Sequence, residues 1–161
     1  MKTMALTLGA VLVGACAFAP EEEIVTSITL PSPPEAVYEV LTNGDDYPEW
    51  NPFIISFEGK VGVGETIAIT VDPANGDPMS FTPEVLVADA GRELRWLGAA
   101  PIPGVFDGEH YFVLSEVPEG TTLTHGERFS GVALWFMDVT EFRNDFEAMN
   151  EALARRLAAE S

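Results

Sequence analysis

The feature that most constrains this chain is a series of short alternating strands that ends in one amphipathic helix. Turn-forming residues separate the strands, as at Gly62-Val63-Gly64 and Asn75-Gly76-Asp77-Pro78. The strands are predicted at 53–58, 66–71, 80–89, 93–98, 108–116 and 122–130. Because short turns join neighbouring strands along the chain, we expect them to pair as an antiparallel meander.

A long helix is predicted at the end of the chain. Apolar side chains recur there at spacings of three and four residues, which places them on one face of a helix. They are Phe142, Phe146, Met149, Leu153 and Leu157. Asp138-Val139-Thr140-Glu141 has the residues of a capped start. A long helix packed across one antiparallel sheet gives an α+β domain.

The part before the sheet is predicted to hold a strand and a short helix. Residues 24–30 alternate as a half-buried strand does. Ser32-Pro33-Pro34-Glu35 has the residues of a helix start, with Ser32 as the N-cap, and Asn43-Gly44 ends that helix. Tyr47-Pro48-Glu49-Trp50-Asn51-Pro52-Phe53 then leads into the sheet.

Residues 1–19 are predicted to be an export signal rather than part of the fold. Thr3 to Val13 is apolar but too short to span a bilayer. Val13-Gly14-Ala15-Cys16 resembles a bacterial lipobox, in which cleavage occurs before a lipidated cysteine. The alternatives are ordinary secretory cleavage after Ala17 or Ala19, and an anchor that is not cleaved.

The expected location is therefore outside the cytoplasm, either as an envelope lipoprotein held to the membrane through Cys16 or as a secreted or periplasmic protein. Residues 20–23, with three consecutive glutamates, are predicted to be an extended acidic tether, and residues 24–161 to form the folded domain. Cys16 is the only cysteine, so a disulfide within the chain is excluded.

The charge of the chain limits its partners. Its 26 acidic residues outnumber 8 Lys and Arg, which gives a formal net charge of −18. Nucleic acid and anionic membrane surfaces would be repelled, so we exclude both as partners. The acidity otherwise serves as a solubilising surface. No sequence feature indicates an oligomeric state.

Few residues suit metal binding or established catalytic motifs. His110 and His125 are the only histidines, and no carboxylate stands near them at ligand spacing, whereas zinc needs three or four convergent ligands. Residues 59–64 lack the glycine spacing of nucleotide-binding loops. Ser130 lacks the Gly-x-Ser-x-Gly setting of a hydrolase nucleophile. We therefore expect neither a metal nor a cofactor.

The best polar constellation lies on the last two predicted strands and consists of His110, Tyr111, His125 and Glu127. Its geometry depends on the hairpin loop. A three-residue loop at 118–120 pairs Tyr111 with Glu127, whereas a four-residue loop pairs His110 with Glu127. A glutamate in an apolar cavity has a raised pKa and can act as an acid or base. The alternative is a hydrogen-bonded polar pair with no catalytic role.

Several motifs, taken in order and spacing, resemble one protein family. They are Trp50-Asn51-Pro52, Gly62-x-Gly64-Glu65, His110-Tyr111-Phe112, Glu127-Arg128-Phe129-Ser130-Gly131 and Phe146-Glu147-Ala148-Met149-Asn150-Glu151-Ala152-Leu153. Through them the chain resembles the START-like, or SRPBCC (polyketide cyclase/dehydratase-like), superfamily over about residues 24 to 158. The resemblance implies a helix-grip fold: two short helices follow the first strand, and a curved antiparallel sheet wraps around the long C-terminal helix.

The same resemblance implies an apolar cavity between the sheet and the C-terminal helix. The side chains expected to contact a ligand there are Trp50, Phe53, Trp96, Phe106, His110, Tyr111, Phe112, Glu127, Phe146 and Met149. Met137 is a further candidate because thioethers adapt to varied shapes. The apolar loop at 99–106 is expected to form a rim or lid. For the aromatic residues, the alternative is ordinary core packing.

The family resemblance implies binding of lipids, sterols, polyketides or other apolar molecules, and we expect a small apolar molecule as the partner of this chain. Two alternatives stay open. One is a cyclase or dehydratase that uses His110 or Glu127 as an acid–base group. The other is a structural envelope domain whose interior is a closed core.

Overall fold

The structure is a computed structural model that describes residues 19–159. Its strands are β1 (Glu21–Leu30), β2 (Ile54–Glu58), β3 (Ala68–Val71), β4 (Met79–Phe81), β5 (Glu84–Asp89), β6 (Glu93–Ala99), β7 (Asp107–Val117) and β8 (Gly120–Ser130). Its helices are α1 (Pro34–Thr42), α2 (Tyr47–Trp50) and α3 (Phe142–Ala159), with the 3₁₀ turns η1 (Gly44–Asp46), η2 (Val132–Trp135) and η3 (Val139–Glu141).

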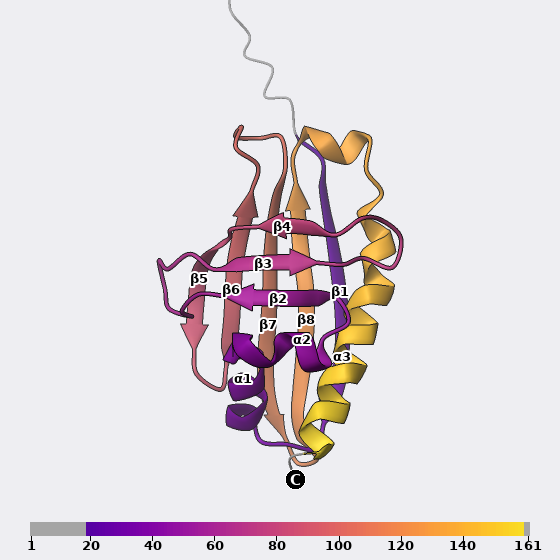
Figure 1. The fold of residues 1–161 in the computed structure, drawn as a ribbon. Coiled ribbons are helices and arrows are strands. Elements are labelled where there is room, and N and C mark those ends of the chain that lie inside the picture. Colours follow the sequence, from indigo (N-terminus) through magenta and orange to yellow (C-terminus); the bar gives the residue numbers. More distant parts are fainter. Residues whose placement is uncertain (1–18, 160–161) are drawn as a thin grey trace, which may run out of the picture.

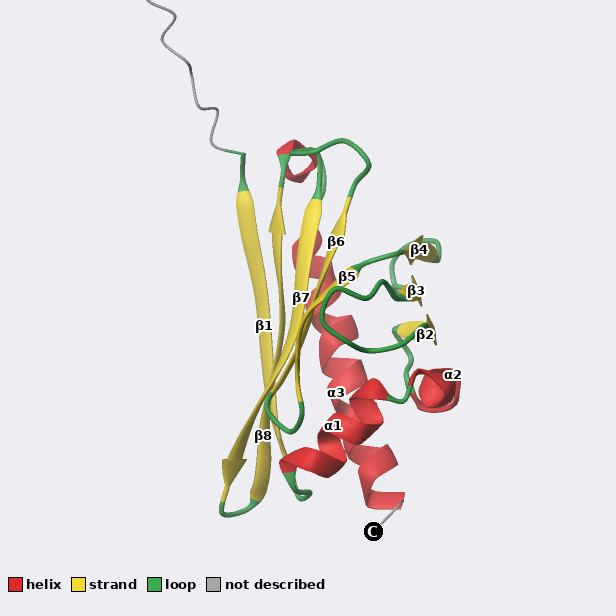
Figure 2. Cartoon of the chain, turned by 90° about the vertical axis from the view of Figure 1, so that its left-hand side faces the viewer, coloured by secondary structure: helices red, strands yellow, loops and turns green. Residues whose placement is uncertain are grey.

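The strands form two antiparallel sheets. The large sheet has the order β1-β8-β7-β6-β5, and the small sheet has the order β2-β3-β4. Figure 1 shows the small sheet running across the strands of the large sheet, with α3 alongside β1 and β8. In Figure 2 the small sheet and α2 face the large sheet across the interior. This arrangement confirms the predicted α+β, helix-grip architecture.

Two features of the strand order differ from the predicted meander. The first strand pairs with the last, β1 with β8, which closes one edge of the large sheet. The predicted strand at 80–89 is divided at Pro83 into β4 and β5, which belong to different sheets. Proline has no backbone N–H to donate to a strand ladder, so the chain leaves one sheet and enters the other at this residue.

The predicted tether at 20–23 also needs correction, because β1 already begins at Glu21. The glutamates pair with the end of β8, from Ser130 to Arg128. Glu23 is fixed by two donors on the outer face of the sheet: Tyr111 Oη and Arg128 Nε, at 2.9 Å and 2.8 Å from its Oε1. These hydrogen bonds stabilise the acidic segment as a strand of the large sheet.

The prediction of Ser32 as the N-cap of the first helix is wrong. Helix α1 begins at Pro34, its N-cap position is Pro33, and no side chain caps it. Ser32 is buried, and its carbonyl oxygen accepts a hydrogen bond from Thr121 Oγ1 on β8 at 2.6 Å. The contact with β8 therefore fixes this residue outside the helix.

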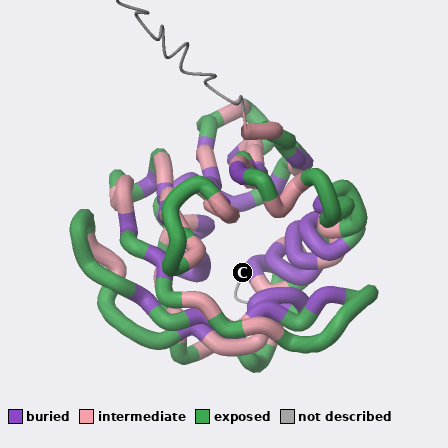
Figure 3. The backbone as a smooth tube through the Cα atoms, turned by 90° about the horizontal axis from the view of Figure 1, so that it is seen from above, coloured by how far each residue is buried: buried purple, intermediate pink, exposed green. Residues whose placement is uncertain are grey.

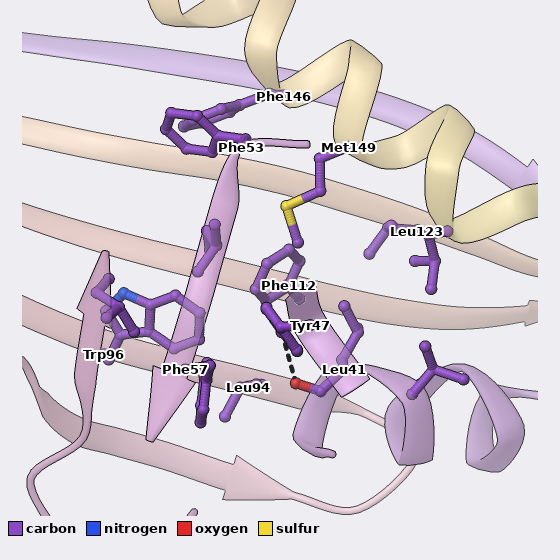
Figure 4. Close-up of a cluster of buried hydrophobic side chains, with 14 of the residues drawn as sticks. Leu41, Tyr47, Phe53, Phe57, Leu94, Trp96, Phe112, Leu123, Phe146 and Met149 are labelled. Carbon is purple, nitrogen blue, oxygen red and sulfur yellow. Dashed lines mark hydrogen bonds between the residues drawn. The ribbon is translucent and has the colours of Figure 1, made fainter. Parts of the chain in front are cut away.

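The apolar stripe of α3 packs against the large sheet as predicted. Phe146, Met149 and Leu153 are fully buried, and Leu157 is nearly so. Figure 4 shows Phe146 and Met149 meeting Phe53, Phe112 and Leu123 in one cluster. Seen from above, the strands and α3 surround one interior, and buried positions occur on both (Figure 3). Within residues 19–159, no helix is both long and apolar enough to cross a membrane.

Candidate ligand-binding cavity and its buried polar network

A cavity of about 710 Å³ lies between the two sheets. Its walls come mainly from β6, β7 and β8 on one side and from β2, β3 and β4 on the other. Apolar residues dominate the lining, and the main ones are Phe53, Ile54, Ala68, Ile69, Val71, Met79, Phe81, Trp96, Phe106, Phe129, Met137 and Phe142. Helix α3 contributes only its first residue to this lining, because Phe146 and Met149 fill the space between helix and sheet. The cavity is thus displaced from its predicted position.

Two glycines give the cavity its depth on the large sheet. Gly98 on β6 is paired with Gly108 on β7, and both line the cavity. A side chain at Gly108 would collide with the carboxyl group of Glu127, whereas a Cβ at Gly98 would meet only ordinary contacts at 3.9 Å. Gly108 therefore makes room for Glu127 at the wall, and Gly98 leaves room for a ligand.

Half of the predicted ligand contacts lie on this cavity. Phe53, Trp96, Phe106, His110 and Glu127 line it, and Ala99, Ala100 and Pro101 of the apolar loop lie on it with Phe106. Phe112, Phe146 and Met149 do not line it; they are 0–1% exposed and form the core beneath. The periodicity of a buried strand or helix does not tell a core side chain from a cavity wall.

Tyr111 lies on the opposite face of the sheet, so it is not part of the cavity wall. Its hydroxyl donates to Glu23 Oε1 at 2.9 Å, and the guanidinium groups of Arg95 and Arg128 lie 4.8 Å and 5.7 Å from its ring centroid. Side chains alternate between the faces of a strand, and His110 takes the inward position. On the outer surface, Tyr111 of β7 instead contacts Glu23 of β1 and Arg128 of β8, and so links the three strands.

Trp50 also lies outside the large cavity. It belongs to the short helix α2, packs on Tyr47 at 5.1 Å between ring centroids, and sits in a shallow surface hollow with Ala152 and Arg156 of α3. Its neighbour Asn51 is buried, and Asn51 Oδ1 accepts from two backbone N–H groups, each at 2.9 Å, at the start of β2. The Trp-Asn-Pro segment therefore has a structural role in turning the chain.

The hairpin between β7 and β8 adopts the register that places His110 opposite Glu127. Only Pro118 and Glu119 separate the paired residues Val117 and Gly120. This register faces both His110 and Glu127 toward the interior, on the same row as Trp96 of β6. The indole of Trp96 stacks on the imidazole of His110, with ring centroids 4.8 Å apart.

A chain of hydrogen bonds runs from the cavity wall into the core. Glu127 Oε2 lies 3.1 Å from His110 Nδ1, and His110 Nε2 lies 2.9 Å from His125 Nε2. His125 Nδ1 then lies 2.9 Å from Asn150 Oδ1 on α3. Asn150 Nδ2 donates to Thr26 Oγ1 at 2.9 Å, and Thr26 donates to the backbone oxygen of His125 at 3.1 Å. Each residue in this series therefore has at least one hydrogen-bond partner.

The partners determine where the protons sit. Asn150 donates through its nitrogen to Thr26, so its oxygen must accept from His125 Nδ1. A neutral His125 then accepts at Nε2, and His110 must donate from its own Nε2. His110 Nδ1 and Glu127 Oε2 are left to share one proton. The series is polarised in one direction, from Glu127 to Thr26.

Burial keeps the ionisable groups of this network neutral. It raises the pKa of Glu127 to about 8 and lowers the pKa of His110 to about 3. The pKa of His125 is also lowered well below its ordinary value, first by burial and then by the neighbouring His110. At pH 7 the Glu127 carboxyl is therefore protonated, and its Oε2 donates a hydrogen bond to His110 Nδ1.

Sequence reasoning missed several parts of this site. Asn150 and Thr26 complete the polar network, and the walls contributed by β3 and β4 carry no recognisable motif. A signal for Asn150 is present: an amide interrupts the apolar side of a helix between Phe146 and Leu153. In the part of the chain that the structure describes, no cluster of three His, Cys, Asp or Glu side chains could hold a metal ion.

The comparisons with known proteins identify the family. The sequence profile of the family described as polyketide cyclase/dehydrase and lipid transport matches residues 21–161. No functionally curated protein matches the chain.

Solved structures share the fold at low sequence identity. Protein MLL2253 from Mesorhizobium loti is 20% identical, with a TM-score of 0.64 over 87% of this chain and 98% of its own. Ginseng major latex-like protein 151 from Panax ginseng is 12% identical, with a TM-score of 0.70 over 84% of this chain and 97% of its own. DynU16, from the dynemicin biosynthetic locus, is 20% identical with a TM-score of 0.66, over 88% of this chain and 49% of its own.

These structures show the helix-grip fold, and the profile match covers nearly all of the described residues. On this ground the chain belongs to the polyketide cyclase/dehydrase and lipid transport family.

Proposed function

We propose that this protein binds a small apolar molecule in the cavity between its two sheets. The observation that carries the proposal is the cavity itself: about 710 Å³, with mostly apolar walls and His110 and Glu127 as a polar point on one wall. Small-molecule sites have this size and this combination of apolar walls with few polar groups. The family description, which includes lipid transport, supports the same reading.

The driving force is removal of apolar surface from water. Each Å² of apolar ligand surface buried contributes about 25 cal/mol, and the cost of fixing the ligand reduces the total. Hydrogen bonds to Glu127 add orientation rather than most of the affinity. The binding free energy is therefore expected to change little with salt, since this interaction does not depend on charge.

Filling the cavity tests the proposal. Gly98→Leu places an isobutyl group in the cavity without a backbone collision, and it should weaken binding of an apolar fluorescent probe at least tenfold. Ser115→Leu adds the same side chain at an exposed position of β7 and is the matched control. Equal probe affinity in both variants and the wild type, or no saturable binding to any of them, would exclude the cavity as a binding site.

A second candidate function is acid–base catalysis, favoured by the pairing of Glu127 with His110 on the cavity wall at 3.1 Å. Glu127 holds a proton near neutral pH because burial raises its pKa to about 8, and the hydrogen bond to His110 Nδ1 orients that carboxyl at the cavity wall. Such a pair suits proton transfer to or from a bound polyketide-like molecule. Glu127→Gln should then abolish turnover but leave binding within about threefold; turnover that survives would remove this candidate.

We also propose, from the sequence alone, that the protein is exported and anchored through lipid on Cys16, a residue outside those the structure describes. Cys16→Ser should move the protein from the membrane fraction to the soluble fraction and leave its circular dichroism unchanged. A wild-type protein that carries the unlipidated mass, and fractionates like the variant, would contradict this proposal.

A further inference from the structure

We infer that the ligand of this cavity is uncharged and presents a hydroxyl or N–H donor to Glu127. This inference rests on the proposed binding function and specifies its ligand. It follows from three observations: the direction of the buried hydrogen bonds, one unoccupied carboxyl oxygen, and the charges on the cavity wall.

The Glu127 carboxyl has one oxygen committed and one free. Oε2 is 3.1 Å from His110 Nδ1 and shares a proton with it. Among the described residues no donor is placed on Oε1, which lies beside Gly108, where the absence of a side chain leaves the carboxyl uncovered. Glu127 lines the cavity and its side chain is 18% exposed. An unpaired oxygen therefore faces the ligand space.

The direction of the network makes this oxygen an acceptor. His110 cannot reverse its donation, because Nε2 faces His125, whose Nδ1–H is held by Asn150. The one proton between His110 and Glu127 therefore stays on the Oε2 side, whichever of the two atoms carries it. Oε1 accepts in both cases, so a ligand hydroxyl or N–H satisfies it, while an ether or ester oxygen leaves it unpaired.

The wall charges exclude an anionic ligand. Among the residues that line the cavity there is no Lys or Arg, and the two ionisable acids there are Glu58 and Glu127. A carboxylate carried into this space would lose water without gaining a cation, and its oxygens would meet the acceptor Oε1. A free fatty acid is therefore expected to bind worse than the corresponding alcohol.

The preference for an uncharged hydrogen-bond donor can be tested by competition against an apolar fluorescent probe at pH 7. The competitors are three molecules with a twelve-carbon chain: 1-dodecanol, dodecanoate and methyl dodecyl ether. The wild-type protein should bind the alcohol at least fivefold more tightly than the other two. Glu127→Gln should keep this preference, because its amide donates to His110 Nδ1 and still offers an oxygen to the ligand. Glu127→Leu should lose the preference while still binding the ether.

Each outcome bears on a different claim. Dodecanoate binding as tightly as the alcohol, or a preference for the alcohol that survives in Glu127→Leu, would overturn the ligand class and leave the binding function standing. Failure of every molecule to displace the probe, or of the probe to bind, would overturn the binding function and this inference with it.

A different observation supports a second inference: we propose that the end of the molecule carrying η2 rests on the surface of a phospholipid bilayer. Apolar side chains are exposed there, and we call them the end patch: Ile102, Val132, Trp135, Phe136 and Met137. Phe136 is 90% exposed and Trp135 60%. Backbone hydrogen bonds from Val132 and Ala133 to Gly104 and Val105 join η2 to the loop at 99–106. Met137 belongs both to the end patch and to the cavity lining.

The first residues that the structure describes lie at the same place. The carbonyl oxygen of Pro20 accepts a hydrogen bond from the backbone N–H of Gly131, directly before η2. Cys16 precedes Pro20 by four residues, and four residues span at most about 14 Å. Lipid on Cys16 would therefore hold the end patch at the membrane, where tryptophan favours the interface. The net charge of −18 favours zwitterionic lipids.

Quenching of tryptophan fluorescence tests this contact. The mature protein, lipidated on Cys16, is reconstituted in phosphatidylcholine vesicles with brominated acyl chains. The wild type should be quenched, Trp135→Phe should lose most of the quenching, and Trp96→Phe, which removes a buried indole, should keep it. Vesicle-bound protein that is not quenched, or Trp135→Phe quenched like the wild type, would overturn the docking surface. Protein that does not bind vesicles would overturn both anchor and surface.

Discussion

Replacing Phe146 by alanine should cost this protein a large part of its stability. The ring of Phe146 is fully buried where α3 meets the large sheet. It stacks on the imidazole of His125 at 4.3 Å between centroids and packs on Phe53 at 5.6 Å. Its removal would therefore open a void between the helix, the sheet and the polar network.

The size of the loss follows from the buried area and the void. An aromatic side chain buries about 150–250 Å², which at about 25 cal/mol per Å² corresponds to about 4–6 kcal/mol. Measured Phe→Ala substitutions in cores cost about 3–5 kcal/mol. Because Phe146 has contacts on several sides and no exposed surface, we expect about 4 kcal/mol. The free energy of unfolding of a whole domain is only about 5–15 kcal/mol, so this single substitution should remove a large part of it.

Urea unfolding followed by far-ultraviolet circular dichroism at 25 °C measures this loss. The control is Phe136→Ala, which removes the same ring from a position that is 90% exposed and should change the free energy of unfolding by less than about 0.5 kcal/mol. A loss below about 1 kcal/mol for Phe146→Ala, or an equal loss in the control, would refute the packing of α3 described above.

Two further predictions concern buried polar groups. Between about pH 6.5 and 8 folded Glu127 keeps its proton, because burial raises its pKa to about 8, while the unfolded chain has lost it. The free energy of unfolding should therefore fall with rising pH in the wild type relative to Glu127→Gln, by up to about 1.4 kcal/mol per unit. His110 and His125, whose pKa values burial lowers, add an opposite slope near pH 6.5 that both proteins share, so the difference between the two proteins isolates Glu127. Tyr47→Phe deletes a buried hydroxyl that donates to the backbone oxygen of Leu41 at 2.7 Å. Urea unfolding should show that the free energy of unfolding falls by about 1–2 kcal/mol. An unchanged free energy of unfolding would mean that this hydrogen bond is not formed.

Much of the fold was predictable because it depends on local patterns. The strands β6, β7 and β8 and the stripe on α3 follow from alternation and helical spacing, which burial against one face imposes. The division at Pro83 was not predictable from alternation alone. The side chains on both sides of Pro83 continue a strand pattern, and only the tertiary structure decides that they enter different sheets.

The site was less predictable, because it depends on register and on distant contacts. The pairing of His110 with Glu127 depends on a turn of only two residues, Pro118 and Glu119. The sequence marks His110, His125 and Glu127 as the polar group, but their order in the network is fixed by Asn150, 25 residues beyond His125. Trp50 stands out in sequence for its flanking prolines, yet these direct a turn rather than a cavity wall.

Native mass spectrometry of the protein mixed with a lipid extract of its own host tests the central claim most directly. If the cavity between the sheets binds a small apolar molecule, the wild type and Ser115→Leu should carry an additional mass in one-to-one ratio. Gly98→Leu should lose it, because its side chain occupies that space. Bare protein in all three samples, or an adduct retained equally by Gly98→Leu, would contradict the claim that the cavity between the sheets binds a small apolar molecule.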